Sequence, residues 1–230
     1  MKTIGMIGGI SWVSTIDYYK LINEGINAKL GGLEFAQCII HSVNYGDIKR
    51  NNDANDWDAN LKLISQAALQ LQNSGASAII ICANTMHHIA DKVQQQINIP
   101  LIHIATATAK SIEQKGLKKV GLLGTKFTME YDFFTNKLKE KNIETIIPDE
   151  EDRNFIHYTI FEELGRSIIN PESKKRYQKI INQLIQKGAE GIILGCTEIP
   201  MLIKQSDVSV PIFDTTYIHS AAAVEFMLAV

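Results

Sequence analysis

The sequence predicts an α/β protein built from two pseudo-symmetric lobes, each a mostly parallel β-sheet flanked by helices. Short apolar runs of strand length alternate along the chain with longer stretches in which apolar residues recur at helical spacing. This alternation favours parallel strands that are joined by helical crossovers. A second observation, a set of landmarks that recurs in the second half, indicates that the whole pattern is duplicated.

The elements of the first half follow from their apolar patterns and their boundary residues. The run Thr3–Gly9 predicts a buried strand that ends in glycines, and the polar stretch after it predicts a helix. We expect Ser14 to cap this helix and Gly31 to close it. The elements predicted next are a strand over 35–43, a helix over 57–75, a strand over 78–82 and a helix over 91–97.

Three landmarks of the first half recur in the second half in the same order. The pairs are Gly5 with Gly121, Cys82 with Cys196, and Pro100 with Pro211, at separations of 116, 114 and 111 residues. Generic strands do not produce such a near-constant spacing by chance, so we infer an internal duplication. We expect a first lobe of residues 1–102 plus 212–230 and a second lobe of residues 103–211.

Composition and charge exclude several classes of partner. The chain has 230 residues, 45% of them apolar, which is enough for a packed core, and its net charge of −2 offers no basic surface for nucleic acid or an anionic membrane. No apolar window reaches the length of a membrane span, and the N-terminus lacks the apolar region of a secretory signal. The three cysteines are widely separated, which argues against a disulfide framework. We therefore expect a cytoplasmic protein with a small-molecule partner.

Two cysteines stand where parallel strands are predicted to end. Ligands of open parallel sheets lie outside the carboxyl ends of the strands, so Cys82 and Cys196 are expected to approach one cleft between the lobes from opposite sides. Each is followed by helix-start residues, namely Asn84 and Thr85 in one lobe and Thr197 in the other. Backbone N–H groups at a helix start bind carboxylates and lower the pKa of a thiol. Two such thiols could act as the base that removes a proton from one face of a carbon atom and the acid that delivers a proton to the opposite face.

The cysteine motifs carry a resemblance to a known family. The segments "IIICANTMH" and "IILGCTEIPML" resemble the two cysteine motifs of the aspartate/glutamate racemase superfamily, and the flanking segments resemble its aspartate racemase branch over essentially the whole chain. The resemblance implies a cofactor-independent racemase of two lobes, often dimeric, in which Cys82 and Cys196 act as acid and base. Ala83 departs from the pattern, because many relatives carry Thr at this position. Alanine lacks the hydroxyl group that threonine would place at the rim of the site.

A substrate with a second carboxylate needs a cation, preferably an arginine that binds two oxygens. The chain has only four arginines. The resemblance to aspartate racemases implies a basic side chain directed towards the substrate at two positions. These positions are Arg50, in the expected loop after the second strand, and Arg166, at the end of "EELGR". Ser11 and Thr125 follow the first strand of each lobe, and their hydroxyls either bind the substrate or cap the next helix.

The sequence leaves some alternatives open. We expect interconversion of L- and D-aspartate, or of glutamate, by two-base proton transfer and without a metal, since no two ligands have C-x₂-C spacing. The alternatives are a maleate isomerase or an arylmalonate decarboxylase-like enzyme, in which one cysteine acts alone, and a non-catalytic two-lobed binding protein. Cys38 is expected to be a core residue, and His103 and His219 to be hydrogen-bonded structural histidines.

Overall fold

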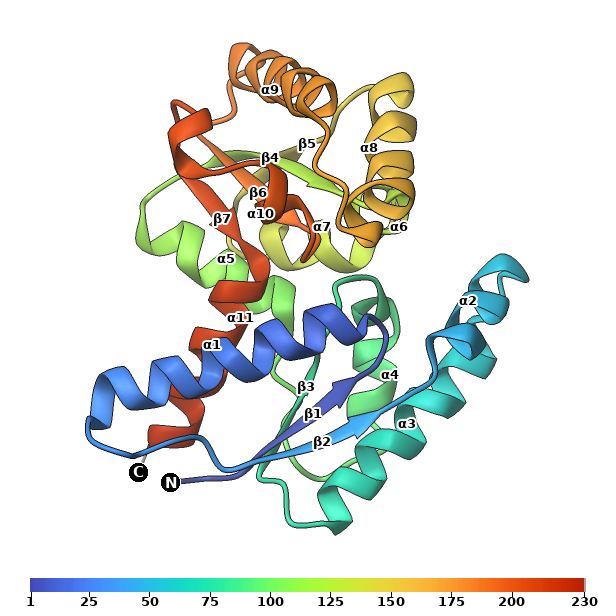
Figure 1. Cartoon of the computed structure of the whole chain (residues 1–230), viewed down its shortest axis with the longest axis vertical. Coiled ribbons are helices and arrows are strands. Elements are labelled where there is room, and N and C mark those ends of the chain that lie inside the picture. The colour runs from blue at the N-terminus through green and yellow to red at the C-terminus, as the bar shows by residue number, and fades with distance from the viewer. Residues whose placement is uncertain (230) are drawn as a thin grey trace. The chain divides into compact units, whose positions relative to one another are not determined.

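The computed structural model describes residues 1–229, which fold into two compact units (Figure 1). Unit 1 contains residues 1–103 and the chain from His219 onward, and unit 2 contains Ile104–Ile218. The sequence analysis placed these divisions at 102/103 and 211/212. None of the helices formed by residues 1–229 has both the length and the apolar character needed to cross a bilayer.

Unit 1 is a three-stranded parallel sheet with helices on both faces. Its elements are β1 (Ile4–Gly8), α1 (Trp12–Leu30), β2 (Cys38–Ser42), α2 (Tyr45–Asp53), α3 (Trp57–Asn73), β3 (Ala78–Ile81), η1 (Thr85–Ile89), α4 (Ala90–Gln94) and most of α11 (Thr215–Leu228). The strand order is β2-β1-β3, and both pairings are parallel, as predicted. Leu101 adds a single parallel bridge to Ile79 at the outer side of β3.

The two faces of this sheet bury different helices, which can be followed in Figure 1. On one face the sheet packs against α1 and α11, through Tyr18, Ile22, Ile26, Ala223, Val224 and Met227. On the other face it packs against α3 and α4, through Ile64, Ala67, Ala68, Leu71 and Val93. Since both faces are covered, β1 and β3 are buried along their whole length rather than alternating, whereas the edge strand β2 is partly exposed.

Two local predictions for unit 1 are wrong. Ser11, not Ser14, caps α1: the backbone of Ser11 is extended and its Oγ accepts from the backbone N–H of Ser14 at 3.3 Å. Arg50 lies in helix α2 rather than in a loop. The helix forms there because Asn44 caps it, with its side chain accepting from the N–H of Gly46 at 3.2 Å.

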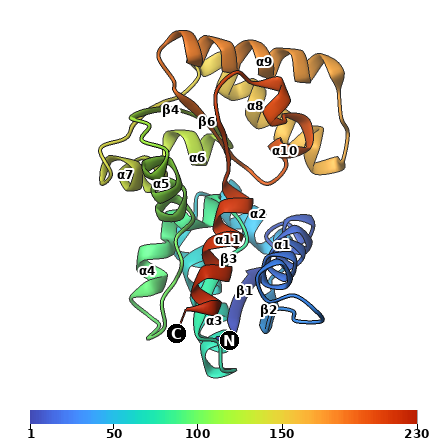
Figure 2. The ribbon, with the colours of Figure 1, turned by 90° about the vertical axis from the view of Figure 1, so that its left-hand side faces the viewer.

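Unit 2 is a four-stranded parallel sheet. Its elements are α5 (Ile104–Gln114), β4 (Lys119–Gly124), α6 (Lys126–Glu130), α7 (Asp132–Lys139), β5 (Glu144–Ile146), α8 (Glu150–Glu162), η2 (Leu164–Arg166), α9 (Pro171–Gln186), β6 (Gly191–Gly195), α10 (Ile199–Leu202), η3 (Gln205–Asp207) and β7 (Ile212–Asp214), followed by the start of α11. The order is β5-β4-β6-β7. Figure 2 shows α8 and α9 on one side of β4 and β6, with α5 and α7 on the other. The pairing of β7 with β6 places residues 212–218 in this unit.

The duplication inferred from the sequence appears in the packing of the two sheets. The orders β2-β1-β3 and β5-β4-β6 are equivalent. A Cβ added to Gly5 in β1 would lie 3.2 Å from the Cβ of Leu71, and one added to Gly121 in β4 would lie 3.3 Å from the Cβ of Leu184. In each unit, therefore, the absence of a side chain at a glycine of the central strand lets a leucine pack closely against the strand. The leucine comes from α3, which precedes β3, in unit 1 and from α9, which precedes β6, in unit 2.

A buried histidine ties α11 to the rest of unit 1. The Nδ1 atom of His219 accepts from the hydroxyl of Tyr18 at 2.8 Å, and its Nε2–H donates to the carbonyl oxygen of Ile102 at 2.7 Å. Both ring nitrogens are thus used in the neutral form, as expected of a structural histidine. Burial lowers the pKa of His219 to about 4, and the charge on His103 acts in the same direction.

This histidine makes unit 1 sensitive to acid. Because the unfolded chain binds a proton on His219 near its ordinary pKa of about 6.5, while the folded chain does not, stability is complete above that pH and falls as the pH drops towards 4. The loss from this residue amounts to about 3 kcal/mol. Urea unfolding at about pH 7.5 and about pH 4.5 measures it. His219→Gln should flatten this pH dependence, and an equal dependence in variant and parent would contradict the assignment.

Candidate active site

Cys82 lies directly after β3, at the carboxyl end of the strand, as the sequence predicts. Its side chain is fully buried. Its backbone N–H donates to the carbonyl oxygen of Ile7 in β1 at 2.9 Å, which extends the parallel ladder by one residue. The position of the thiol is therefore set by the central strand of unit 1.

Two side chains hold the loop that carries Cys82. The hydroxyl of Ser14, on α1, donates to the carbonyl oxygen of Cys82. The Nδ1–H of His87 donates to the carbonyl oxygen of Ala83 at 2.8 Å. Two consecutive carbonyl groups are thereby fixed, which orients the loop around the thiol. The sequence analysis missed both contacts, although the four-residue spacing from Ala83 to His87 is that of a helical turn.

The ring of His87 is itself buried. It packs edge-on against His103 and His219, with ring centroids 4.8 and 5.4 Å away. Its Nε2 atom has no hydrogen-bond partner among residues 1–229. Burial holds the pKa of His87 well below its ordinary value, so the ring is neutral, and protonation of the neighbouring His103 or His219 would lower this pKa further. Within the same described residues, no three His, Cys, Asp or Glu side chains gather as a metal site requires.

Cys196 occupies the equivalent place in unit 2, directly after β6. The strand is paired with β4 up to Gly195, and the thiol that follows is 9% exposed. The Sγ of Cys196 donates to Oε2 of Glu198 at 2.8 Å, and the Oγ1 of Thr197 donates to the same oxygen at 2.6 Å. The sequence does not predict this contact between Cys196 and Glu198.

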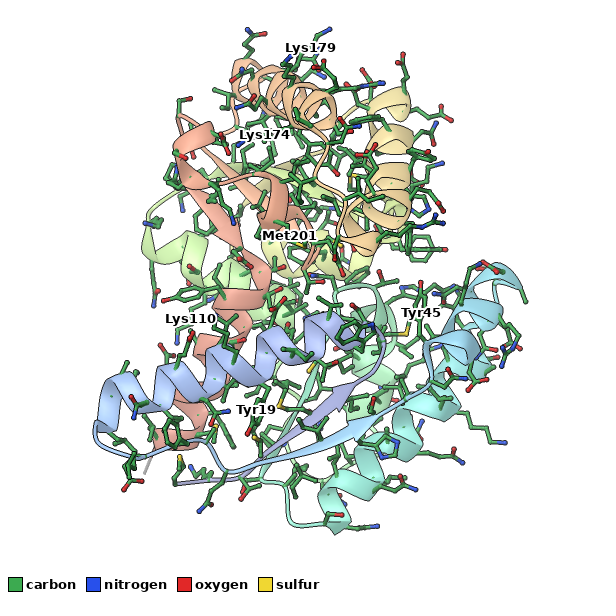
Figure 3. The ribbon with its side chains drawn as sticks, in the orientation of Figure 1. Tyr19, Tyr45, Lys110, Lys174, Lys179 and Met201 are labelled. Atoms are coloured by element: carbon green, nitrogen blue, oxygen red, sulfur yellow. The ribbon has the colours of Figure 1, made fainter. Side chains whose placement is uncertain are left out.

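The first helical segments that follow the cysteines are short. Asn84 is buried just before η1, a 3₁₀-helix of five residues that begins at Thr85. Cys196 and Thr197 precede α10, a helix of four residues whose Met201 is labelled in Figure 3. A single turn sums few peptide dipoles, so α10 supplies little of the field that the sequence predicts at Cys196, whereas η1 continues directly into α4.

The expected lowering of the thiol pKa values is wrong in sign. Burial raises the pKa of Cys82 well above its ordinary value. Burial also raises the pKa of Cys196, and the charge and hydrogen bond of Glu198 raise it further, while the backbone N–H groups of Thr197 and Glu198 oppose this less strongly. Burial therefore disfavours a thiolate at either position, and a positive charge brought by a ligand would favour it.

The two candidate arginines are exposed, and each is paired with an acidic side chain. Arg50, in the last turn of α2, has 70% of its side chain exposed and forms an ion pair with Asp47. Arg166, the last residue of η2, is 64% exposed and pairs with Glu162 at 2.6 Å. Exposed pairs of this kind are weak, so either arginine can exchange its partner for a carboxylate of a ligand.

Ser11 and Thr125 are helix caps in equivalent places. The Oγ of Ser11 accepts from the N–H of Ser14, and the Oγ1 of Thr125 accepts from the N–H of Thr128, each at 3.3 Å. Thr125 is also 3.2 Å from the hydroxyl of Thr128. The capping role predicted as one alternative is thus confirmed for both residues.

Comparisons with known proteins give a consistent picture. The sequence profile of the Asp/Glu/Hydantoin racemase family matches residues 7–223. A candidate Asp/Glu racemase from Yersinia pestis is 46% identical with a TM-score of 0.95, and an aspartate racemase homologue from Pyrococcus horikoshii OT3 is 38% identical with a TM-score of 0.88; both matches cover 100% of each chain. The broad specificity amino-acid racemase RacX from Bacillus subtilis (strain 168) is 27% identical over 177 residues, 76% of this chain and 75% of that protein.

Proposed function

This chain belongs to the Asp/Glu/Hydantoin racemase family and is an amino-acid racemase, and we propose that its substrate is aspartate. The match to the Pyrococcus horikoshii homologue of aspartate racemase over the full length of both chains supports this choice. The two exposed arginines, each held only by a surface ion pair, supply cations for a distal carboxylate. Glutamate, which has the same two carboxylates and one more methylene, is the second substrate of the proposal.

The observation that carries the proposed mechanism is the equivalence of Cys82 and Cys196. Each buried thiol follows a strand that pairs with the central strand of its unit, β3 beside β1 and β6 beside β4. In the mechanism, one cysteine as thiolate removes the α-proton from one face of Cα, and the other as thiol delivers a proton to the opposite face. The ammonium group of the substrate is the positive charge that lowers the raised thiol pKa values.

The polar groups next to the cysteines complete the proposed site. Asn84 and Thr85 follow Cys82, and Thr197 follows Cys196. We propose that donors of these three residues bind the α-carboxylate of the substrate. Holding this carboxylate matters because negative charge builds on it as the α-proton leaves. Ser11 and Thr125, although they cap helices, belong to the same strand-end loops and are proposed to contact the substrate as well.

We further propose a cytoplasmic homodimer without a cofactor. Cys38, Cys82 and Cys196 are all free thiols, which agrees with a reducing compartment. The homodimer and the absence of a cofactor rest on the resemblance to aspartate racemases.

A deuterium experiment tests the reaction and its two-base mechanism together. Protein that has been dialysed against a chelator and a carbonyl reagent is incubated in D₂O with L-aspartate or with D-aspartate. We expect early product of the opposite configuration to carry deuterium while recovered substrate carries little, because separate groups serve the two faces. Equal labelling of both pools from the start would indicate one exchanging base and contradict the mechanism.

The same preparation distinguishes the alternatives. Turnover of maleate or of an arylmalonate without turnover of aspartate would favour the reactions in which one cysteine acts alone. Binding of aspartate without any turnover would favour a binding protein. Racemisation of many neutral amino acids at equal rates would instead indicate a broad substrate specificity, as the name of RacX describes for that protein.

A further inference from the structure

The two cysteines have different electrostatic surroundings, although the strands that carry them are equivalent. Burial alone accounts for the raised pKa of Cys82. Cys196, by contrast, hydrogen-bonds through its thiol to the carboxylate of Glu198, two residues further along the chain. A racemase of this form is therefore not electrostatically symmetric.

The carboxylate of Glu198 is held in place by a second donor. The hydroxyl of Thr197 and the thiol of Cys196 both donate to Oε2 of Glu198, at 2.6 and 2.8 Å. A carboxylate is an acceptor only, so the proton in the Cys196 contact must reside on sulfur while Glu198 is ionised. The geometry thus selects the thiol form of Cys196.

Other titratable groups of unit 2 do not replace Glu198 in this contact. Tyr177, on α9, has its pKa raised well above the ordinary value, first by burial, and it is therefore a neutral phenol; Glu163, and Cys196 when it is ionised, act in the same direction. Its hydroxyl donates to the carbonyl oxygen of Ile156 at 3.4 Å. Glu163, at the end of α8, accepts through Oε1 from the side chain of Asn170 at 3.2 Å.

We propose that Glu198 is a positioning residue that keeps Cys196 protonated, which makes Cys196 the proton donor and leaves Cys82 to become the proton acceptor once the substrate ammonium is bound. This inference rests on the proposed two-base mechanism. It assigns different roles to two cysteines that the sequence alone does not distinguish.

The proton balance of one turnover follows from this assignment. Cys82 as thiolate takes the α-proton and becomes a thiol, while Cys196 gives its thiol proton to the opposite face and becomes a thiolate. The new thiolate lies beside the carboxylate of Glu198, and this like-charge contact favours its reprotonation. Cys196 then regains a proton from solvent, and Cys82 releases one to solvent, so the resting pair returns with no net change in protons.

The test measures the Cys196 thiol directly in full-length protein. Because the chain has three cysteines, Cys38→Ser combined with Cys82→Ala leaves Cys196 as the single thiol. The rate of alkylation by iodoacetamide is followed by mass spectrometry as a function of pH, and the midpoint of this profile reports the ionisation of Cys196. Glu198→Gln is then added to the same background, since it keeps the size of the side chain and removes its charge.

We expect Glu198→Gln to move the midpoint to lower pH and to raise the alkylation rate at about pH 8 roughly tenfold, since each unit of pKa changes the thiolate fraction tenfold below the midpoint. Glu172→Gln is the matched control: it removes an exposed carboxylate of unit 2 that pairs with Lys175, and it should leave the midpoint in place. Thr197→Val removes the competing donor to Oε2, so it should strengthen the thiol contact and move the midpoint to higher pH.

An unchanged midpoint in Glu198→Gln, with a circular dichroism spectrum like that of the parent, would overturn the proposal. If Glu198→Gln does not fold, Thr197→Val decides, because a midpoint that moves to lower pH there would overturn the proposal and a move to higher pH would support it. These measurements do not depend on turnover. A chain that shows the expected midpoints but does not racemise aspartate would leave the role of Glu198 intact and contradict the proposed function instead.

Discussion

Replacement of either Cys82 or Cys196 by alanine is expected to abolish racemisation of aspartate. Two-face proton transfer needs a group on each side of Cα, and general acid–base catalysis by one group contributes roughly 10²–10⁴-fold, so either loss should reduce kcat by at least that factor. The readout is the rate of appearance of the opposite enantiomer by chiral chromatography, from L-aspartate and from D-aspartate. Both directions should fail together, because the same pair of thiols serves each of them.

Cys38→Ala is the matched control for this prediction. Cys38 is partly buried at the start of β2, and its Sγ lies 3.8 Å from the carbonyl oxygen of Ala36. We expect this variant to keep the activity of the parent. Each of the three substitutions removes one sulfur atom and should cost only about 1 kcal/mol of unfolding free energy, which urea titration checks. Near-normal turnover in Cys82→Ala or Cys196→Ala would refute the two-base mechanism.

Arg50→Ala is expected to lose roughly ten- to a hundredfold in kcat/KM on aspartate, because a charge-assisted contact to a carboxylate contributes about 1.5–3 kcal/mol. Arg50→Lys keeps the charge but not the planar pair of donors, so its loss should be smaller. Alanine has no distal carboxylate and should be a poor substrate for parent and variants alike. Steady-state kinetics on aspartate, glutamate and alanine measure these differences.

Arg166 provides the matched comparison for Arg50. Both side chains are exposed, and both pair with a carboxylate three or four residues earlier, Asp47 for Arg50 and Glu162 for Arg166. A surface arginine without contact to the substrate should tolerate alanine with little change in kcat/KM. If Arg50→Ala keeps the parent kcat/KM and Arg166→Ala does not, Arg166 is the residue that contacts the distal carboxylate.

The sequence by itself determined the fold class, the duplication and the places of the two thiols. Apolar runs such as Ala78–Ile81 are buried on both faces, so their composition alone identifies strands of a covered parallel sheet. Gly5 and Gly121 mark the close approach of a helix to each central strand, and this steric demand leaves a direct trace in the sequence. Cys82 and Cys196 follow such strands, and strand ends are set by local pattern.

Only the tertiary structure decided the electrostatics of the site. The sequence placed both thiols at helix starts and predicted a lower pKa, whereas desolvation in the folded chain raises the pKa of both. Burial depends on residues distant in the chain, such as those of α1 and α11 that cover the Cys82 face of the sheet, and no local pattern reports it. The hydrogen bond from Cys196 to Glu198 likewise depends on side-chain directions at a turn, which spacing in the sequence does not fix.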